Sequence, residues 1–116
     1  MSLKRIQPGP RYSEAVIHND TVYLAGQVGE GDTIEAQARS ALAYIEELLA
    51  AAGSDKSRLI MVTIWLADMA DYDAMNAVWD AWIGGAAAPA RATGESKLAS
   101  PDYKIEIIAT AALAKD

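Results

Sequence analysis

The chain has 116 residues, of which 52% are apolar, and a formal net charge of −6, so we expect residues 1–116 to form a single domain with a modest core. It contains no cysteine, which excludes disulfides, thiolate catalysis and metal sites built from cysteine. Its one histidine, His18, lies in a polar turn, so we expect neither a Ser-His-Asp triad nor a metal site of clustered histidines. The basic residues form no cluster, and nucleic-acid binding relies on such clusters, so we expect no nucleic-acid partner.

The N-terminal stretch lacks the apolar run of a signal peptide. No segment approaches the roughly 20 apolar residues that are needed to span a bilayer. We therefore expect a soluble, cytoplasmic protein with no membrane partner.

Three short strands are predicted in the first part of the chain. Residues 4–6 are typical of an edge strand, which ends where two prolines follow it. Residues 15–17 and 21–24 flank a polar turn at residues 19–20 and predict a β-hairpin. The second hairpin strand ends near Gly26, which lets a backbone or a ligand approach closely because it has no side chain.

The strongest helical pattern covers residues 34–52. Asp32 and Glu35 have the spacing of a capping box, and Gly53 suits the cap at the C-terminal end. Apolar residues recur along this segment at spacings of three and four, which predicts one stripe facing the core. The stripe consists of Ile34, Ala38, Ala41, Leu42, Ile45, Leu48, Leu49 and Ala52.

The second half of the chain predicts a buried strand, a helix and two more strands. Residues 59–66 are almost continuously apolar, as in a strand covered on both faces. We expect Asp71 to cap a helix that ends at residues 84–85, and strands over residues 91–98 and 103–112. The helix carries one apolar face, and we interpret the three tryptophans of this half as core residues. That face consists of Tyr72, Met75, Val78, Trp79 and Trp82, and the third tryptophan is Trp65.

The predicted order is β-β-β-α-β-α-β-β, and right-handed crossovers should place both helices on one face of a mixed sheet. Two helices cover only one face of such a sheet. The last strand is nevertheless apolar on both sides, and an exposed apolar patch usually marks an interface, so we expect a closed homo-oligomer. Its apolar residues are Ile105, Ile107 and Ala109 on one side and Ile108 and Ala112 on the other.

Two charged residues stand in apolar surroundings, where a charge needs a partner. Arg91 begins a predicted strand among small residues, and Glu106 lies inside the last strand. A guanidinium suits a carboxylate in a bidentate pair, and a partly buried glutamate can hold a water molecule or move a proton. Two interpretations stay open: a small-molecule site for a carboxylate-bearing substrate, or a structural ion pair of Arg91 with Glu95 or Glu106.

Five sequence blocks lie in order along nearly the whole chain: GPRYSEAV at residues 9–16, YLAGQV at 23–28, DYDAMNAV at 71–78, PARAT at 89–93 and KIEI at 104–107. Together they resemble the Rid (YjgF) family of reactive-intermediate deaminases. The resemblance implies an α/β (α+β) fold of the chorismate-mutase-like (YjgF-like) type and a homotrimer with sites at the subunit clefts. It also implies hydrolysis of 2-imino or enamine acids to 2-oxo acids and ammonia, as by a 2-iminobutanoate/2-iminopropanoate deaminase, with no metal or organic cofactor.

The resemblance also implies roles for individual residues. Arg91 matches the arginine that clamps the substrate carboxylate, and Glu106 matches the glutamate associated with the hydrolytic water. A protonated imine carbon is already electrophilic, so such a site needs mainly orientation and a positioned water. The other matched positions line the family's pocket: they are Tyr12, Gly26, Asn76 and Thr93, the last standing where members often place cysteine or serine.

The chain departs from the family pattern at Ala25, where serine is common, at Ile108, where many members carry a second glutamate, and at Glu14, where glutamine is usual. These departures suggest a divergent subgroup. Because Arg91 is kept, we favour retained deaminase activity. The alternative is a non-catalytic trimer that binds a small carboxylate as a sensor or scaffold, and RNA cleavage is disfavoured by the acidic charge.

Overall fold

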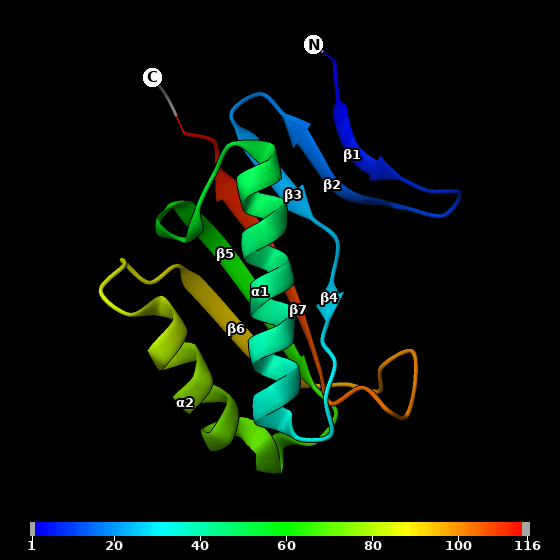
Figure 1. Ribbon diagram of the computed structural model, residues 1–116, viewed down its shortest axis with the longest axis vertical. Helices are drawn as coiled ribbons and strands as arrows, with labels where there is room; N and C mark the ends of the chain where they lie inside the picture. Colours follow the sequence, from blue (N-terminus) through cyan, green and yellow to red (C-terminus); the bar gives the residue numbers. More distant parts are fainter. Residues whose placement is uncertain (1, 115–116) are drawn as a thin grey trace.

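The computed structural model describes residues 2–114 and shows one mixed sheet with the strand order β1-β2-β3-β7-β5-β6 (Figure 1). A further short strand, β4, pairs with β7. Among the strands of residues 2–114, only β5 and β6 are parallel neighbours, and helix α2 lies in the connection between them. The elements are β1 (Lys4–Pro8), β2 (Ser13–His18), β3 (Thr21–Leu24), β4 (Gln27–Val28), α1 (Ile34–Ala52), η1 (Lys56–Arg58), β5 (Leu59–Leu66), η2 (Met69–Asp71), α2 (Tyr72–Ile83), β6 (Ala90–Glu95) and β7 (Ile105–Ala112).

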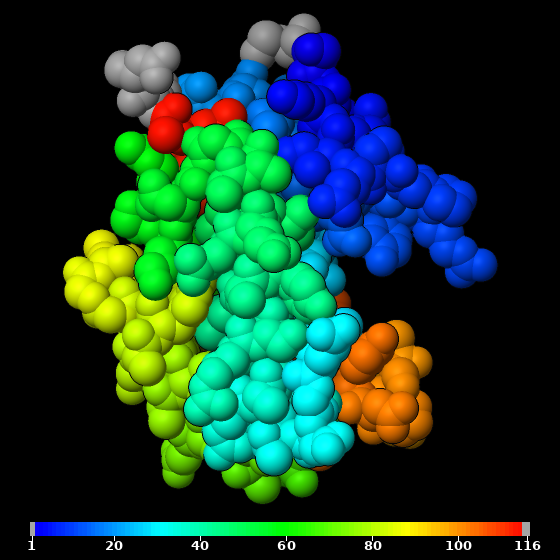
Figure 2. Space-filling model, viewed as in Figure 1, coloured from blue at the N-terminus to red at the C-terminus, as the bar shows by residue number. Residues whose placement is uncertain are grey.

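Both helices lie on one face of the sheet, so that prediction is confirmed (Figure 1). Figure 2 shows α1 running along this covered face, with the tip of the β1–β2 hairpin projecting beyond the body of the molecule. No helix within residues 2–114 is both long and apolar enough to cross a membrane. Along β7, buried residues alternate with half-buried ones, as expected of a strand with one face on the core. The β7 residues in the core are Ile105, Ile107, Ala109 and Ala111.

The opposite face of the sheet carries no helix, and we call it the open face. Cross-strand register places Glu106 beside Trp65 and Thr110 between Tyr23 and Met61 on this face. The interpretation of Trp65 as a core residue is wrong, because its side chain is 37% exposed on the open face. A continuous apolar run does not reveal strand alternation, which turns Trp65 away from its buried neighbour Leu66.

Several strand boundaries differ from the predictions, and three of the differences lie at β1, β6 and β7. β1 continues to Pro8, which pairs with Ser13, because an edge strand tolerates a proline that donates no ladder bond. β6 ends at Glu95 rather than at residue 98, and β7 begins at Ile105 rather than at residue 103. The two-residue strand β4 was not predicted as a separate element.

The N-terminal cap of α1 is Thr33 rather than Asp32, so the predicted capping box is wrong. Thr33 has extended backbone angles, and its Oγ1 accepts a hydrogen bond from the amide of Ala36 at 3.1 Å. At the other end, Gly53 is the C-terminal cap as predicted, with a left-handed φ of 88°. The cap position is therefore set by the residue whose backbone is extended, one place after the acid that the spacing favours.

We expect Thr33→Ala to lower the free energy of unfolding by about 1 kcal/mol, because the Ala36 amide loses its acceptor. Asp32→Ala is the matched control, and it should change stability much less since Asp32 is exposed and makes no capping bond. Urea unfolding of the two variants measures both values. Equal losses would contradict the assignment of Thr33 as the cap.

The second helix begins through a 3₁₀ turn. Asp71 occupies its N-cap position, as predicted, but its side chain makes no capping hydrogen bond. The Asp68 side chain instead accepts from the Ala70 amide at 2.9 Å, at the start of η2. Glu95 at the end of β6 accepts from the Met69 amide at 3.0 Å, which ties η2 to the sheet.

One buried amide holds the loop that leads into β7. Gln37 on α1 is 3% exposed, and its Nε2 donates to the carbonyls of Gly31 at 3.0 Å and Asp102 at 2.9 Å. Its Oε1 accepts from the Lys104 amide at 2.8 Å. Gln37 thus fixes the residues just before β7, which carries Glu106.

Candidate functional site

Arg91 lies on β6 at the edge of the sheet and faces the helix-covered side. It pairs in register with the buried Val62, and its guanidinium carbon lies 5.2 Å from the centre of the Trp79 ring on α2. Within residues 2–114, Arg91 forms no ion pair with a carboxylate. Neither structural partner considered from the sequence, Glu95 or Glu106, pairs with it, so Arg91 packs on an aromatic ring and has no carboxylate partner in the described part of the chain.

Two other predicted site residues lie on the same side of the sheet as Arg91. Thr93 is two residues further along β6, and its hydroxyl oxygen is buried without a hydrogen-bond partner among the described residues. Asn76 is one turn before Trp79 on α2, so the two side chains are neighbours on the helix. We call Arg91, Thr93 and Asn76 the arginine group.

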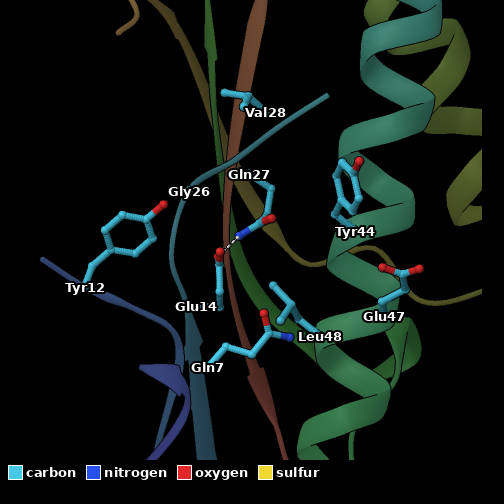
Figure 3. Close-up of a pocket in the computed structure, with 9 residues that line it drawn as sticks. All are labelled: Gln7, Tyr12, Glu14, Gly26, Gln27, Val28, Tyr44, Glu47 and Leu48. Atoms are coloured by element: carbon cyan, nitrogen blue, oxygen red, sulfur yellow. Dashed lines mark hydrogen bonds between the residues drawn. The ribbon is translucent and has the colours of Figure 1, made fainter. Parts of the chain in front are cut away.

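Glu106 faces the open side of β7, where its cross-strand neighbour is Trp65. It is half-buried, and its carboxylate makes no hydrogen bond or ion pair within residues 2–114. Its carboxyl group lies against the backbone of Gly26. Gly26 in turn lines a cavity together with Tyr12, whose side chain is 63% exposed (Figure 3). We call Glu106, Gly26 and Tyr12 the glutamate group.

A single chain does not bring the two groups together. Arg91 is opposite Val62 and faces the helices, whereas Glu106 is opposite Trp65 and faces the open side. Strand β5 also separates β6 from β7. Arg91 and Glu106 are therefore not neighbours within one chain.

The cavity beside the glutamate group has a volume of about 400 Å³ and lies between the β1–β2 hairpin, β4 and α1 (Figure 3). Gln27 Nε2 donates to Glu14 Oε1 at 3.1 Å across it. The nearby charge of Glu30, which also accepts a hydrogen bond from Tyr44, raises the pKa of the Tyr44 hydroxyl. The lining residues are Gln7, Tyr12, Glu14, Gly26, Gln27, Val28, Tyr44, Glu47 and Leu48.

The polarity of this cavity does not suit the carboxylate of a substrate. Its lining contains the carboxylates of Glu14 and Glu47 and no lysine or arginine. Arg91 does not line this cavity; it lies on β6, at the far edge of the sheet from the β1–β2 hairpin. Most of the lining was missed from the sequence, because it combines a hairpin, a two-residue strand and a helix that no spacing rule connects. Within residues 2–114, no three side chains of the kinds that ligate metals converge.

The fold matches solved structures closely. Over its whole length, the chain superposes on 98% of a YjgF-family protein from Neisseria meningitidis with a TM-score of 0.98 and 42% identity. A family model described as Endoribonuclease L-PSP matches residues 2–113. The architecture is thus that of the α+β proteins of the YjgF type.

Sequence relatives agree with this class. A RutC family protein from Haemophilus influenzae is 46% identical over 112 residues, which cover 93% of the chain and 96% of that protein. A 2-iminobutanoate/2-iminopropanoate deaminase from Mus musculus is 35% identical over 112 residues, which cover 89% of the chain and 81% of that protein. The chain belongs to the Rid/YjgF/RutC family, as its sequence blocks predicted.

Proposed function

We propose that the chain is an imine deaminase that hydrolyses 2-imino or enamine acids to 2-oxo acids and ammonia. The observation that carries this proposal is Arg91, a cation that packs on the Trp79 ring and has no carboxylate partner among residues 2–114. Such a guanidinium can bind a ligand carboxylate in bidentate fashion. The net charge of −6 disfavours the endoribonuclease activity that the family description names.

The proposed site draws on two copies of the chain. Because Arg91 and Glu106 face opposite sides of the sheet, they can act on one substrate only if different copies supply them. The exposed Tyr23, Met61 and Trp65 make the open face suitable for packing against another copy. We therefore propose a homotrimer in which the arginine group of one copy meets the glutamate group of the next.

In this site the chemistry needs few groups. Arg91 binds the substrate carboxylate, and the unpartnered Thr93 hydroxyl donates a hydrogen bond beside it. Glu106 accepts a proton from a water molecule while the water oxygen bonds to the imine carbon. The carbon–nitrogen π electrons move to nitrogen in this step, and Glu106 then returns the proton to nitrogen. As the remaining carbon–nitrogen bond breaks and ammonia leaves with its electron pair, the proton of the new hydroxyl group passes to Glu106 and the carbonyl forms. The balance is one imine and one water in, one 2-oxo acid and one ammonia out.

Glu106→Gln tests this assignment directly. We expect kcat for imine hydrolysis to fall by about 100-fold or more, because the amide cannot take the proton from water. The affinity for a 2-oxo acid should stay nearly unchanged, because Arg91 holds the carboxylate. Ammonia release from imines generated in situ by an amino-acid oxidase measures the first, and calorimetric titration with 2-oxobutanoate measures the second.

Glu35→Gln is the matched control. It removes a carboxylate on α1 that lies outside the proposed site, so kcat should not change. If the unmodified protein releases ammonia no faster than buffer across a panel of imino acids, the deaminase proposal is wrong. Binding of 2-oxobutanoate in that case would support the non-catalytic carboxylate-binding alternative.

A further inference from the structure

The closest packing around the proposed catalytic carboxylate is with a glycine. A Cβ atom placed on Gly26 would lie 2.9 Å from Cδ and 3.1 Å from Cγ of Glu106, and it would overlap Oε2. These three nearest atoms all belong to the Glu106 side chain. The carboxyl group therefore occupies the space that any other residue at position 26 would fill.

The sheet explains why this space exists. Strand β3 pairs with the last part of β7, and β4 pairs with its first part, where Val28 is opposite Glu106. Between the two strands the chain leaves the β7 ladder, and the Ala25 amide donates to the carbonyl of Glu14 instead. Gly26 lies two residues before Val28, so its missing side chain would project on the same side of the sheet as Glu106.

We propose that Gly26 is a positioning residue for Glu106. Its lack of a side chain leaves a space beside the Gly26 backbone, which we call the seat, and the carboxylate in this seat is oriented toward the hydrolytic water. This inference rests on the proposed function. The Glu106 carboxylate has no hydrogen-bond or ion-pair partner within residues 2–114, so we infer that its close packing against Gly26 orients it. The role differs from the substrate contact that the family resemblance implies for Gly26.

Gly26→Ala should leave the fold intact, because the atoms that must move are the far end of a flexible side chain. The displaced carboxylate should cost roughly 100-fold in kcat, the typical effect of a misplacement of about 1 Å. KM should change much less, since Arg91 still binds the substrate carboxylate. The melting temperature should stay close to that of the unmodified protein.

Two glycines serve as comparisons. A Cβ at Gly85 meets nothing within 4 Å, so Gly85→Ala should change neither kcat nor the melting temperature. A Cβ at Gly29 would lie 2.7 Å from the backbone nitrogen of Ala41 in α1, so Gly29→Ala should lower the melting temperature. Gly26→Ala is expected to affect catalysis without that loss of stability.

A second substitution at residue 106 tests whether Gly26→Ala acts by displacing the carboxylate or by a general loss of activity. Aspartate at position 106 is one methylene shorter and withdraws the carboxylate from the added methyl group. The double variant Gly26→Ala/Glu106→Asp should therefore be no less active than Glu106→Asp alone, so that the two losses do not add. Additive losses would overturn the positioning role.

A measurement without turnover completes the test. The carbon-13 resonance of the Glu106 carboxyl, assigned by its absence in Glu106→Gln, should shift in Gly26→Ala and stay in place in Gly85→Ala. An unmoved resonance, or an unchanged kcat in an active protein, overturns the inference. A protein with no deaminase activity at all overturns the proposed function, and with it the catalytic role of the seat, whereas a shifted resonance would still establish the contact.

Discussion

Arg91→Ala is expected to lower kcat/KM for imine hydrolysis by at least about 100-fold, with most of the loss in KM. A charge-assisted hydrogen bond is worth about 1.5–3 kcal/mol, and a bidentate carboxylate loses two of them. The substrate carboxylate keeps its charge throughout the reaction, so Arg91 binds the ground state and the transition state alike. Initial rates of ammonia release over a range of imine concentrations separate the two constants.

The same substitution should leave the protein folded. Arg91 contacts the Trp79 ring but has no carboxylate partner within residues 2–114, so its removal costs a cation–π contact of about 1 kcal/mol. Had Arg91 been half of a buried ion pair, the loss would be about 3–5 kcal/mol, because a carboxylate would be left alone. Unfolding in urea distinguishes these two values.

Two variants sharpen this experiment. Arg91→Lys keeps the charge but loses the planar fork, so its KM should lie between those of the unmodified protein and Arg91→Ala. Arg39→Ala removes an exposed cation from α1 and should leave KM unchanged. An unchanged KM in Arg91→Ala would contradict the carboxylate-binding role.

Mixing two inactive variants tests whether the site is shared. If Arg91 and Glu106 come from different copies, exchange of subunits between Arg91→Ala and Glu106→Gln trimers should restore complete sites. Random mixing of equal amounts gives an intact Arg91 and an intact Glu106 at about a quarter of the clefts. Activity that stays at the level of the separate variants would contradict the two-copy site.

The sequence predicted the helices and strands better than it predicted which side of the sheet each side chain faces. The period of α1 and the hairpin turn are local patterns, and both were confirmed. The exposure of Trp65 was missed because residues 59–66 are apolar throughout, so only the observed register shows which side of β5 meets the helices. The Thr33 cap was missed because an acid at residue 32 offers an equally good spacing.

The candidate site shows the same limit. Arg91 and Glu106 were found as charges in apolar strands, and in the structure neither forms an ion pair within residues 2–114. Their placement on opposite faces depends on the registers of both strands with β5, which lies between them in the sheet. Spacing along the sequence contains no information on that register. The seat at Gly26 was likewise out of reach, although the glycine itself was noticed.

Gln37→Met is expected to lower the free energy of unfolding by about 2–4 kcal/mol, because three hydrogen bonds of a buried side chain are lost. Methionine has a similar length but makes none of the three hydrogen bonds of the Gln37 side chain, and each lost bond costs about 0.5–1.5 kcal/mol. Such a loss is a large part of the total stability of a small domain. Urea unfolding measures it.

Gln37→Glu is the control for shape, and its effect should depend on pH. A protonated carboxyl can donate to one carbonyl and accept from the Lys104 amide, whereas the ionised form would face the carbonyl oxygens of Gly31 and Asp102. The folded state therefore favours the protonated form, so the variant should lose stability as pH rises above about 4.3, the ordinary pKa of glutamate. A pH-independent loss would contradict this account.

The backbone amide of Lys104 should exchange its hydrogen faster in both Gln37 variants, because the Gln37 side chain supplies its hydrogen-bond acceptor. Lys104 lies two residues before Glu106, so this measurement links the buried Gln37 side chain on α1 to the strand that carries the proposed catalytic carboxylate.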